Sequence, residues 1–114
     1  MAAKTSPAAR SASLLRSEGW HVETVEQTIR TRLGSFKRDL AGAFDLICFP
    51  TTDALRDTFM LVQVTSAANH AARRTKIANE PRVQWCRMAG AILELHSWRK
   101  NAAGEWVCKR EDLS

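Results

Sequence analysis

The sequence lacks the features that mark membrane, secreted and zinc-binding proteins. No apolar run approaches the roughly 20 residues that a membrane-spanning helix needs, and the start "MAAKTSPAARSAS" is small and polar where a secretion signal has an apolar core. Cys48, Cys86 and Cys108 form no CxxC pair and no Cys/His ligand spacing, which argues against a disulfide framework and a structural zinc site. We therefore expect an intracellular, cytoplasmic protein with reduced thiols and no membrane partner.

The signatures of several enzyme classes are missing as well. The chain has no Gly-rich phosphate loop, and no arrangement of Ser, His and Asp or of Cys and His suggests a nucleophile. It also has no internal repeat and no low-complexity segment. The search for a site therefore turns to polar residues inside apolar segments.

Positive charge is in excess. The 17 Lys and Arg residues outnumber 12 Asp and Glu residues, so the formal net charge is +5 and the pI is about 9.6. This balance suits a polyanionic partner such as nucleic acid. A length of 114 residues suits one sheet with a few helices, so we expect a single domain over residues 1–114, with residues 1–7 loose.

The hydrophobic pattern predicts an α/β fold. Residues 8–18 are good helix formers that end at Gly19, and residues 27–42 form a basic connector without a clean period, either a surface loop or a long bent hairpin. The predicted strands cover residues 20–26, 43–49, 59–65, 91–100 and a last segment through Trp106, and further helices are predicted at 70–80 and 81–90. In the helix at 81–90 the candidates for burial are Val83, Trp85, Cys86 and Met88.

Polar residues interrupt two of these strands. Asp45 lies inside "AFDLICF", and Gln63 and Thr65 lie two apart in "LVQVTS", so they share one face of their strand. A buried carboxylate costs several kcal/mol unless it is paired or bound to a metal. Asp45 therefore either pairs with an arginine of the basic connector or, with the Gln63 oxygen on a neighbouring strand, offers oxygen ligands to a magnesium ion.

These residues resemble those of a known family. The order αβββαβ, the aspartate of "GAFDLI" and the polar pair of "LVQVTS" are similar to the PD-(D/E)XK nuclease superfamily, particularly its small Holliday-junction-resolvase-like and phage-encoded members. The likeness covers about residues 8–98, and "RDLAGAFDLI" adds the D-x-x-G-x-x-D spacing of some members. It implies a restriction-endonuclease-like core, a mixed sheet flanked by helices. It also implies hydrolysis of DNA, with branched DNA as one candidate substrate, dependence on Mg²⁺ or Mn²⁺, and a homodimer.

The resemblance assigns roles to four residues. Asp45 matches the metal-binding aspartate of the family, whereas Gln63 stands where the second acid would be and Thr65 where the lysine would be. Residues 8–11 hold no carboxylate to match the first-helix acid of many members. Lys76 on the next helix is a candidate replacement for the lysine, although it also suits a helical pair with Glu80. The expected catalytic residues are thus Asp45, Gln63, Thr65 and Lys76, and the expected metal ligands are Asp45 and Gln63.

Basic residues extend the expected site. A run of cations on the connector and another on the helix after "LVQVTS" suit phosphate contacts, although such faces are also common on solvated helices. His70 is either a phosphate contact or a solvent-facing or capping residue, and His96 is expected to be a sheet-face residue. The candidates for nucleic-acid binding are Arg30, Arg32, Lys37, Arg38, His70, Arg73 and Arg74.

Three functions agree with these observations. The first is a magnesium-dependent DNA nuclease. The second is a nuclease fold that has lost catalysis and keeps a surface for nucleic acid, since the first-helix acid, the second acid and the lysine are all replaced. The third is a protein-interaction role, such as a small phage-type factor. Salt dependence separates the last from the others, because phosphate contacts weaken steeply as salt rises.

Overall fold

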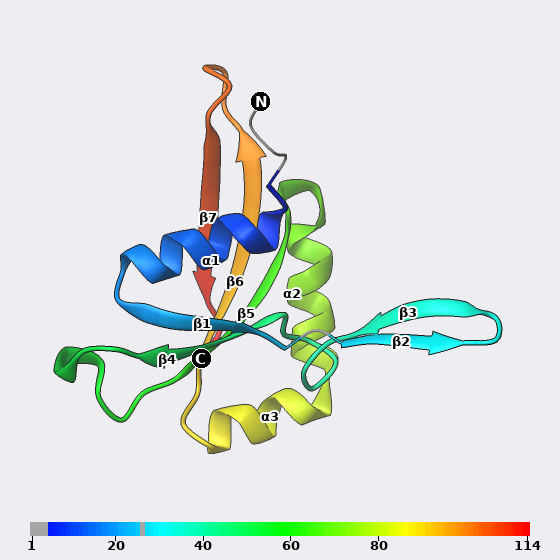
Figure 1. Cartoon of the computed structure of the whole chain (residues 1–114), viewed down its shortest axis with the longest axis horizontal. Coiled ribbons are helices and arrows are strands. Elements are labelled where there is room, and N and C mark those ends of the chain that lie inside the picture. Colours follow the sequence, from blue (N-terminus) through cyan, green and yellow to red (C-terminus); the bar gives the residue numbers. More distant parts are fainter. Residues whose placement is uncertain (1–4, 26) are drawn as a thin grey trace.

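A mixed sheet with helices on both faces forms the body of the protein (Figure 1). The computed structural model describes residues 5–25 and 27–114, and within these ranges the main sheet has five strands and the chain has three α-helices. Strands β5 and β6 are parallel, and the other neighbours are antiparallel. In spatial order the strands are β1 (Trp20–Thr24), β4 (Leu46–Pro50), β5 (Met60–Ser66), β6 (Ile92–Lys100) and β7 (Trp106–Asp112). The predicted α/β class is confirmed.

The helices divide between the two faces of the sheet. Helix α1 (Pro7–Ser17) covers one face, and α2 (His70–Asn79) and α3 (Pro81–Met88) cover the other (Figure 1). Ser6 begins α1 because its side chain accepts a hydrogen bond from the Ala9 N–H, and proline suits the first turn. The expectation of a loose segment is therefore wrong for Ser6 and Pro7, while residues 1–4 lie outside the described ranges. None of the described helices is long and apolar enough to cross a membrane.

Strand β5 lies at the centre of the sheet, as its apolar faces predict. Met60, Val62 and Val64 belong to the core under α1, whereas Leu61 belongs to the core under α2 and α3. Because side chains alternate along a strand, Gln63 shares the face of Leu61 and is buried there. The polar row of "LVQVTS" therefore lies on the side of α2.

The basic connector is a hairpin. Strands β2 (Gln27–Thr31) and β3 (Gly34–Arg38) form a separate two-stranded sheet, in which Gln27 pairs with Arg38 and Arg30 with Ser35. Figure 1 shows this hairpin projecting from the body of the molecule. Of the two predicted forms of the connector, the structure has the hairpin.

A tight turn leads from the hairpin into β4. Ala41 and Gly42 both have positive φ, and an isolated bridge joins Leu40 to Phe44. Glycine suits position 42 because its φ of +67° lies in the left-handed region that other residues rarely adopt. The turn leaves Asp45 immediately before β4, one residue outside the strand in which it was predicted.

Candidate functional site

Asp45 and Gln63 meet where β4 and β5 begin to diverge. The two strands pair Leu46 with Val62, so the residue before Leu46 lies beside Gln63. Asp45 is only 7% exposed, and its Oδ2 accepts hydrogen bonds from Gln63 Nε2 at 2.7 Å and from the Val64 backbone N–H at 2.9 Å. The predicted convergence of these two strands on Asp45 is confirmed.

The Gln63 amide satisfies Asp45 through its nitrogen. Nε2 also donates to the Val64 carbonyl at 3.1 Å, whereas Oε1 is buried and has no hydrogen-bond partner among the described residues. A buried acceptor without a partner costs free energy, and most such atoms in folded proteins are satisfied. Oε1 is therefore the polar atom of this site with an unmet need for a donor or a cation.

The Gln63 amide turns its nitrogen toward Asp45, so a pair of oxygens for a cation would require a rotation of the amide. Turning the Gln63 amide by a half-turn exchanges its oxygen and nitrogen and sets Oε1 beside Asp45 Oδ2. Two oxygens in that arrangement suit a cation, and Mg²⁺ needs only one or two carboxylates when water and substrate phosphate complete its shell. In the described ranges no group of three or more His, Cys, Asp and Glu residues is arranged to hold a metal. The donor set is thus one acid and one amide.

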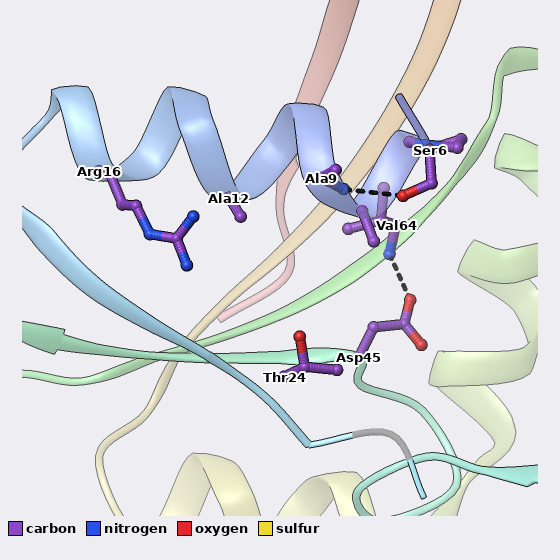
Figure 2. A pocket seen from close by; sticks show the side chains of 9 residues that line it. Ser6, Ala9, Ala12, Arg16, Thr24, Asp45 and Val64 are labelled. Carbon is purple, nitrogen blue, oxygen red and sulfur yellow. Dashed lines mark hydrogen bonds between the residues drawn. The ribbon is translucent and has the colours of Figure 1, made fainter. Parts of the chain in front are cut away.

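A pocket of about 520 Å³ opens between the start of α1 and Asp45. Figure 2 shows the Asp45 carboxylate reaching the Val64 backbone beside the first turns of the helix. That first turn carries no acidic residue, as the sequence predicts, and small side chains leave the space open. The pocket is lined by Ser6, Pro7, Ala8, Ala9, Ala12, Arg16, Thr24, Asp45 and Val64.

Arg16 is a pocket residue that was not among the sequence candidates. It extends from α1 toward the strands, and its guanidinium donates to the Val22 carbonyl at 3.3 Å (Figure 2). Helical spacing in the sequence could have identified Arg16 as a candidate, because Ala9, Ala12 and Arg16 are three and four residues apart and so share one face of the helix. The pocket lining therefore contains a positively charged guanidinium, that of Arg16, as well as the buried carboxylate of Asp45.

Gln63, Thr65 and Lys76 do not line this pocket. Thr65 is buried on β5 and pairs in register with Ser97. Lys76 is exposed on α2, where its charge acts on Glu80. The pKa of Glu80 is lowered mainly by its hydrogen bonds with Arg82, and Arg82 is the ion-pair partner. The structure thus brings Asp45 and Gln63 together and leaves the other two candidates apart from them.

The candidate nucleic-acid contacts divide into two groups. Arg30, Arg32 and Arg38 are exposed on the hairpin, and the side chain of Lys37 lies outside the described part. On α2, Arg73 is half-buried, while Arg74 is exposed and forms an ion pair with Glu111. The exposed charge of the hairpin makes it the stronger candidate surface.

His70 is not solvent-facing, and that expectation is wrong. The residue is 5% exposed, with Nδ1 at 2.7 Å from Ser97 Oγ and Nε2 at 2.8 Å from Glu111 Oε1. Both ring nitrogens are therefore engaged in the interior, which leaves neither for a phosphate. Its partners lie 27 and 41 residues away, so no local pattern reveals them.

A second serine–histidine–glutamate chain lies across the sheet. Ser11 Oγ is 2.8 Å from His96 Nδ1, and His96 Nε2 is 2.8 Å from Glu94 Oε1. Trp98 Nε1 donates to the same Ser11 oxygen. Because Ser11 and His96 are fully buried, this chain cannot present a nucleophile to a substrate. It joins α1 to β6. The hydrogen-bonded set Ser97, His70 and Glu111 likewise joins α2 to β6 and β7.

The cysteines do not supply a nucleophile either. All three are free, in agreement with the predicted reduced thiols. Burial raises the pKa of Cys48 to about 12 and that of Cys108 to about 11. Burial also raises the pKa of Cys86. These thiols therefore stay protonated at neutral pH.

No family model matches the chain, and comparison with curated proteins and with solved structures gives no match. The geometry of the pocket is therefore the basis for a function.

Proposed function

We propose that the protein is a nuclease of the PD-(D/E)XK type that hydrolyses phosphodiester bonds in DNA with Mg²⁺ or Mn²⁺. The observation that carries the proposal is the meeting of Asp45 and Gln63, at 2.7 Å and beside a pocket of about 520 Å³. The order α1, β1, β4, β5, α2, β6 supports it, because it follows the αβββαβ core of that superfamily, with β6 parallel to β5.

The proposal gives each residue a distinct role. Asp45 lines the pocket, whereas Gln63 is buried beside it on the face of β5 opposite to Val64 and is not part of the lining. These two residues would hold the cation, and a bound cation would polarise the phosphate and stabilise the charge that develops during hydrolysis. Arg16 offers a guanidinium to a phosphate oxygen. The N-terminus of α1 adds a partial positive charge on the same side of the pocket. The pocket thus supplies positive charge around one phosphate group.

Thr65 stands where the superfamily has its lysine, and this difference bears on the expected rate of hydrolysis. A hydroxyl cannot supply the positive charge that an ammonium places beside the attacking water. Lys76 is exposed on α2 and does not line the pocket. We therefore expect hydrolysis to be slow and to depend strongly on the cation.

Cleavage by an isosteric variant tests the assignment. Asp45→Asn keeps an oxygen for the hydrogen bonds from Gln63 and Val64 but removes the charge, so the fold should survive. We expect it to lower Mg²⁺-dependent cleavage of a plasmid, a linear duplex and a four-way junction by at least about a hundredfold. Asp53→Asn removes the same charge at an exposed position and should cleave like the wild type. Cleavage by Asp45→Asn at the rate of an active wild type would overturn the site assignment.

A catalytically inactive nuclease fold that binds nucleic acid is the second candidate. It is favoured by the orientation of Gln63, whose amide nitrogen satisfies Asp45 without any cation. In that case neither the wild type nor Asp45→Asn cleaves any of the three substrates, while both bind DNA equally and with a steep salt dependence. Binding that is insensitive to salt would instead favour the protein-interaction role.

A further inference from the structure

The β2–β3 hairpin stands apart from the core of the protein. Within the described residues its strands pair with each other and with no strand of the main sheet, and the hairpin projects from the body (Figure 1). Each strand has five residues, which corresponds to a reach of about 17 Å. A hairpin of this size adds little to a folded core, so its sequence is free to serve a binding role.

Its charge is of one sign. Residues 27–38 contain no acidic residue and four basic ones, Arg30, Arg32, Lys37 and Arg38. The formal net charge of the whole chain is +5. Arg30, Arg32 and Arg38 are exposed. Like charges repel one another on so small a ribbon, and a polyanion relieves that repulsion. The complementary partner is therefore strongly negative along its length.

The tip of the hairpin combines a basic and an apolar side chain, Arg32 and Leu33. Leu33 is 100% exposed in the two-residue turn between the strands and follows Arg32 directly. Polar residues and glycine dominate such turns, so the conformation of the turn does not explain a leucine at this position. A basic ribbon with an apolar side chain at its tip suits a partner that offers phosphates at the sides and apolar edges between them. Duplex DNA has this composition, because thymine methyl groups line the floor of its major groove.

The root of the hairpin adjoins the pocket. The backbone N–H of Val25, one residue after β1, donates to the Asp45 carbonyl at 2.9 Å. Thr24, the last residue of β1, lines the pocket. The end of β1, which leads into the hairpin, therefore lies close to Asp45.

We propose that the β2–β3 hairpin is an arm that lies in the major groove of double-stranded DNA, with Leu33 against base edges and the arginines on the flanking phosphates. The major groove is about 12 Å wide and admits a two-stranded ribbon. The proposal rests on the proposed function, which it deepens by naming duplex DNA and the surface that grips it.

Binding without a metal tests the arm separately from cleavage. A labelled duplex of about 20 base pairs, two turns of DNA, is titrated in EDTA and followed by fluorescence anisotropy. The triple variant Arg30→Ser, Arg32→Ser, Arg38→Ser should raise Kd at least about tenfold and lower the salt slope by about 3, close to one unit for each arginine–phosphate interaction removed. Leu33→Ser should weaken binding severalfold and leave the salt slope unchanged.

A matched variant controls for total charge. Arg56→Ser, Arg99→Ser, Lys109→Ser removes the same number of exposed cations from other elements and should change Kd by less than about twofold. An equal loss of DNA affinity in both triple variants would overturn the proposal that the hairpin is the DNA-binding arm. Unchanged thermal unfolding shows that the hairpin variants are folded, which we expect because none of the hairpin side chains that the structure describes belongs to a core cluster.

Groove and strandedness are tested with the same probe. Methyl green, a major-groove ligand, should compete with the protein, and netropsin, a minor-groove ligand, should not. Competition by netropsin alone, or tighter binding of the single strand than of the duplex, would overturn the proposal. The titration in EDTA contains no divalent cation and measures no cleavage, so its outcome for the arm is independent of the outcome of the cleavage test.

Discussion

At the scale of single residues, the polar groups of the interior occur in sets that join distant parts of the chain. Ser11, on α1, accepts a hydrogen bond from Trp98 and contacts His96, both on β6. Its hydroxyl links the buried His96 and the partly buried Trp98 to the helix. One small side chain therefore supplies the hydrogen-bond partner of two polar groups on the α1 face.

Removal of this hydroxyl should destabilise the protein. Ser11→Ala leaves the Trp98 N–H and one His96 nitrogen without their partner, and a buried polar group left unsatisfied costs about 1–3 kcal/mol. Ser13→Ala, at an exposed position of the same helix, should cost nothing measurable. Urea unfolding of the two variants and the wild type measures the difference. Equal free energies of unfolding for both variants would show that the Ser11 hydrogen bonds contribute nothing.

The predictability of these residues follows from their spacing. Asp45 and Gln63 could be paired from the sequence because adjacent strands joined by a short connection come side by side. Ser11 and His96 could not, because 85 residues separate them and one sequence does not indicate which distant polar groups meet. Arg16 was recoverable from helical spacing, but only once the pocket had been located.

At the scale of elements, the period of the apolar residues predicted most of the fold. The central position of β5, the two faces of the sheet and the closing pair β6 and β7 all follow from it. Helix α3 departs from its prediction, since Val83 is buried while Trp85 and Met88 are mostly exposed. With only eight residues and one face against the core, α3 leaves its second apolar face uncovered by the described part of the chain. The apolar residues of a short helix do not by themselves indicate which side of the helix packs against the core.

Helix α2 is held to the sheet by an ionic contact that depends on pH. Hydrogen bonds from Arg74 and then from His70 hold the pKa of Glu111 below its usual value. A carboxylate with a lowered pKa in the folded state contributes stability above its unfolded pKa, about 4.3, and the contribution is lost as the pH falls through the folded pKa.

Glu111→Gln should therefore be less sensitive to acid than the wild type. The variant is expected to be less stable at pH 7, because the contacts with Arg74 and His70 are weakened, and to lose less of its remaining stability between about pH 5 and pH 3. Chemical unfolding across this range measures both effects. Glu105→Gln, at an exposed position, should follow the wild-type profile. A Glu111→Gln profile parallel to that of the wild type would contradict the assigned coupling.

At the scale of the whole molecule, charge and polarity are distributed unevenly. The hairpin is basic throughout, whereas the pocket beside its root holds the buried acid Asp45. A separate apolar groove of about 320 Å³ lies between α3 and the sheet, near the exposed Trp85. The arrangement places the basic hairpin next to a pocket that contains a buried carboxylate, and the proposed function builds on this arrangement. The homodimer expected from the resemblance stays a prediction.

Thermal unfolding with and without Mg²⁺, at constant ionic strength, tests the central claim that Asp45 and Gln63 form a cation site. A ligand that binds only the folded state raises the stability of the whole molecule, so even weak binding is measurable. We predict that Mg²⁺ raises the Tm of the wild type and leaves that of Asp45→Asn unchanged. Gln63→Glu, which buries a second carboxylate, should lose about 3 kcal/mol without the cation and show the largest rise in Tm with it. If Mg²⁺ shifted all three proteins equally, or none of them, the claim would be contradicted.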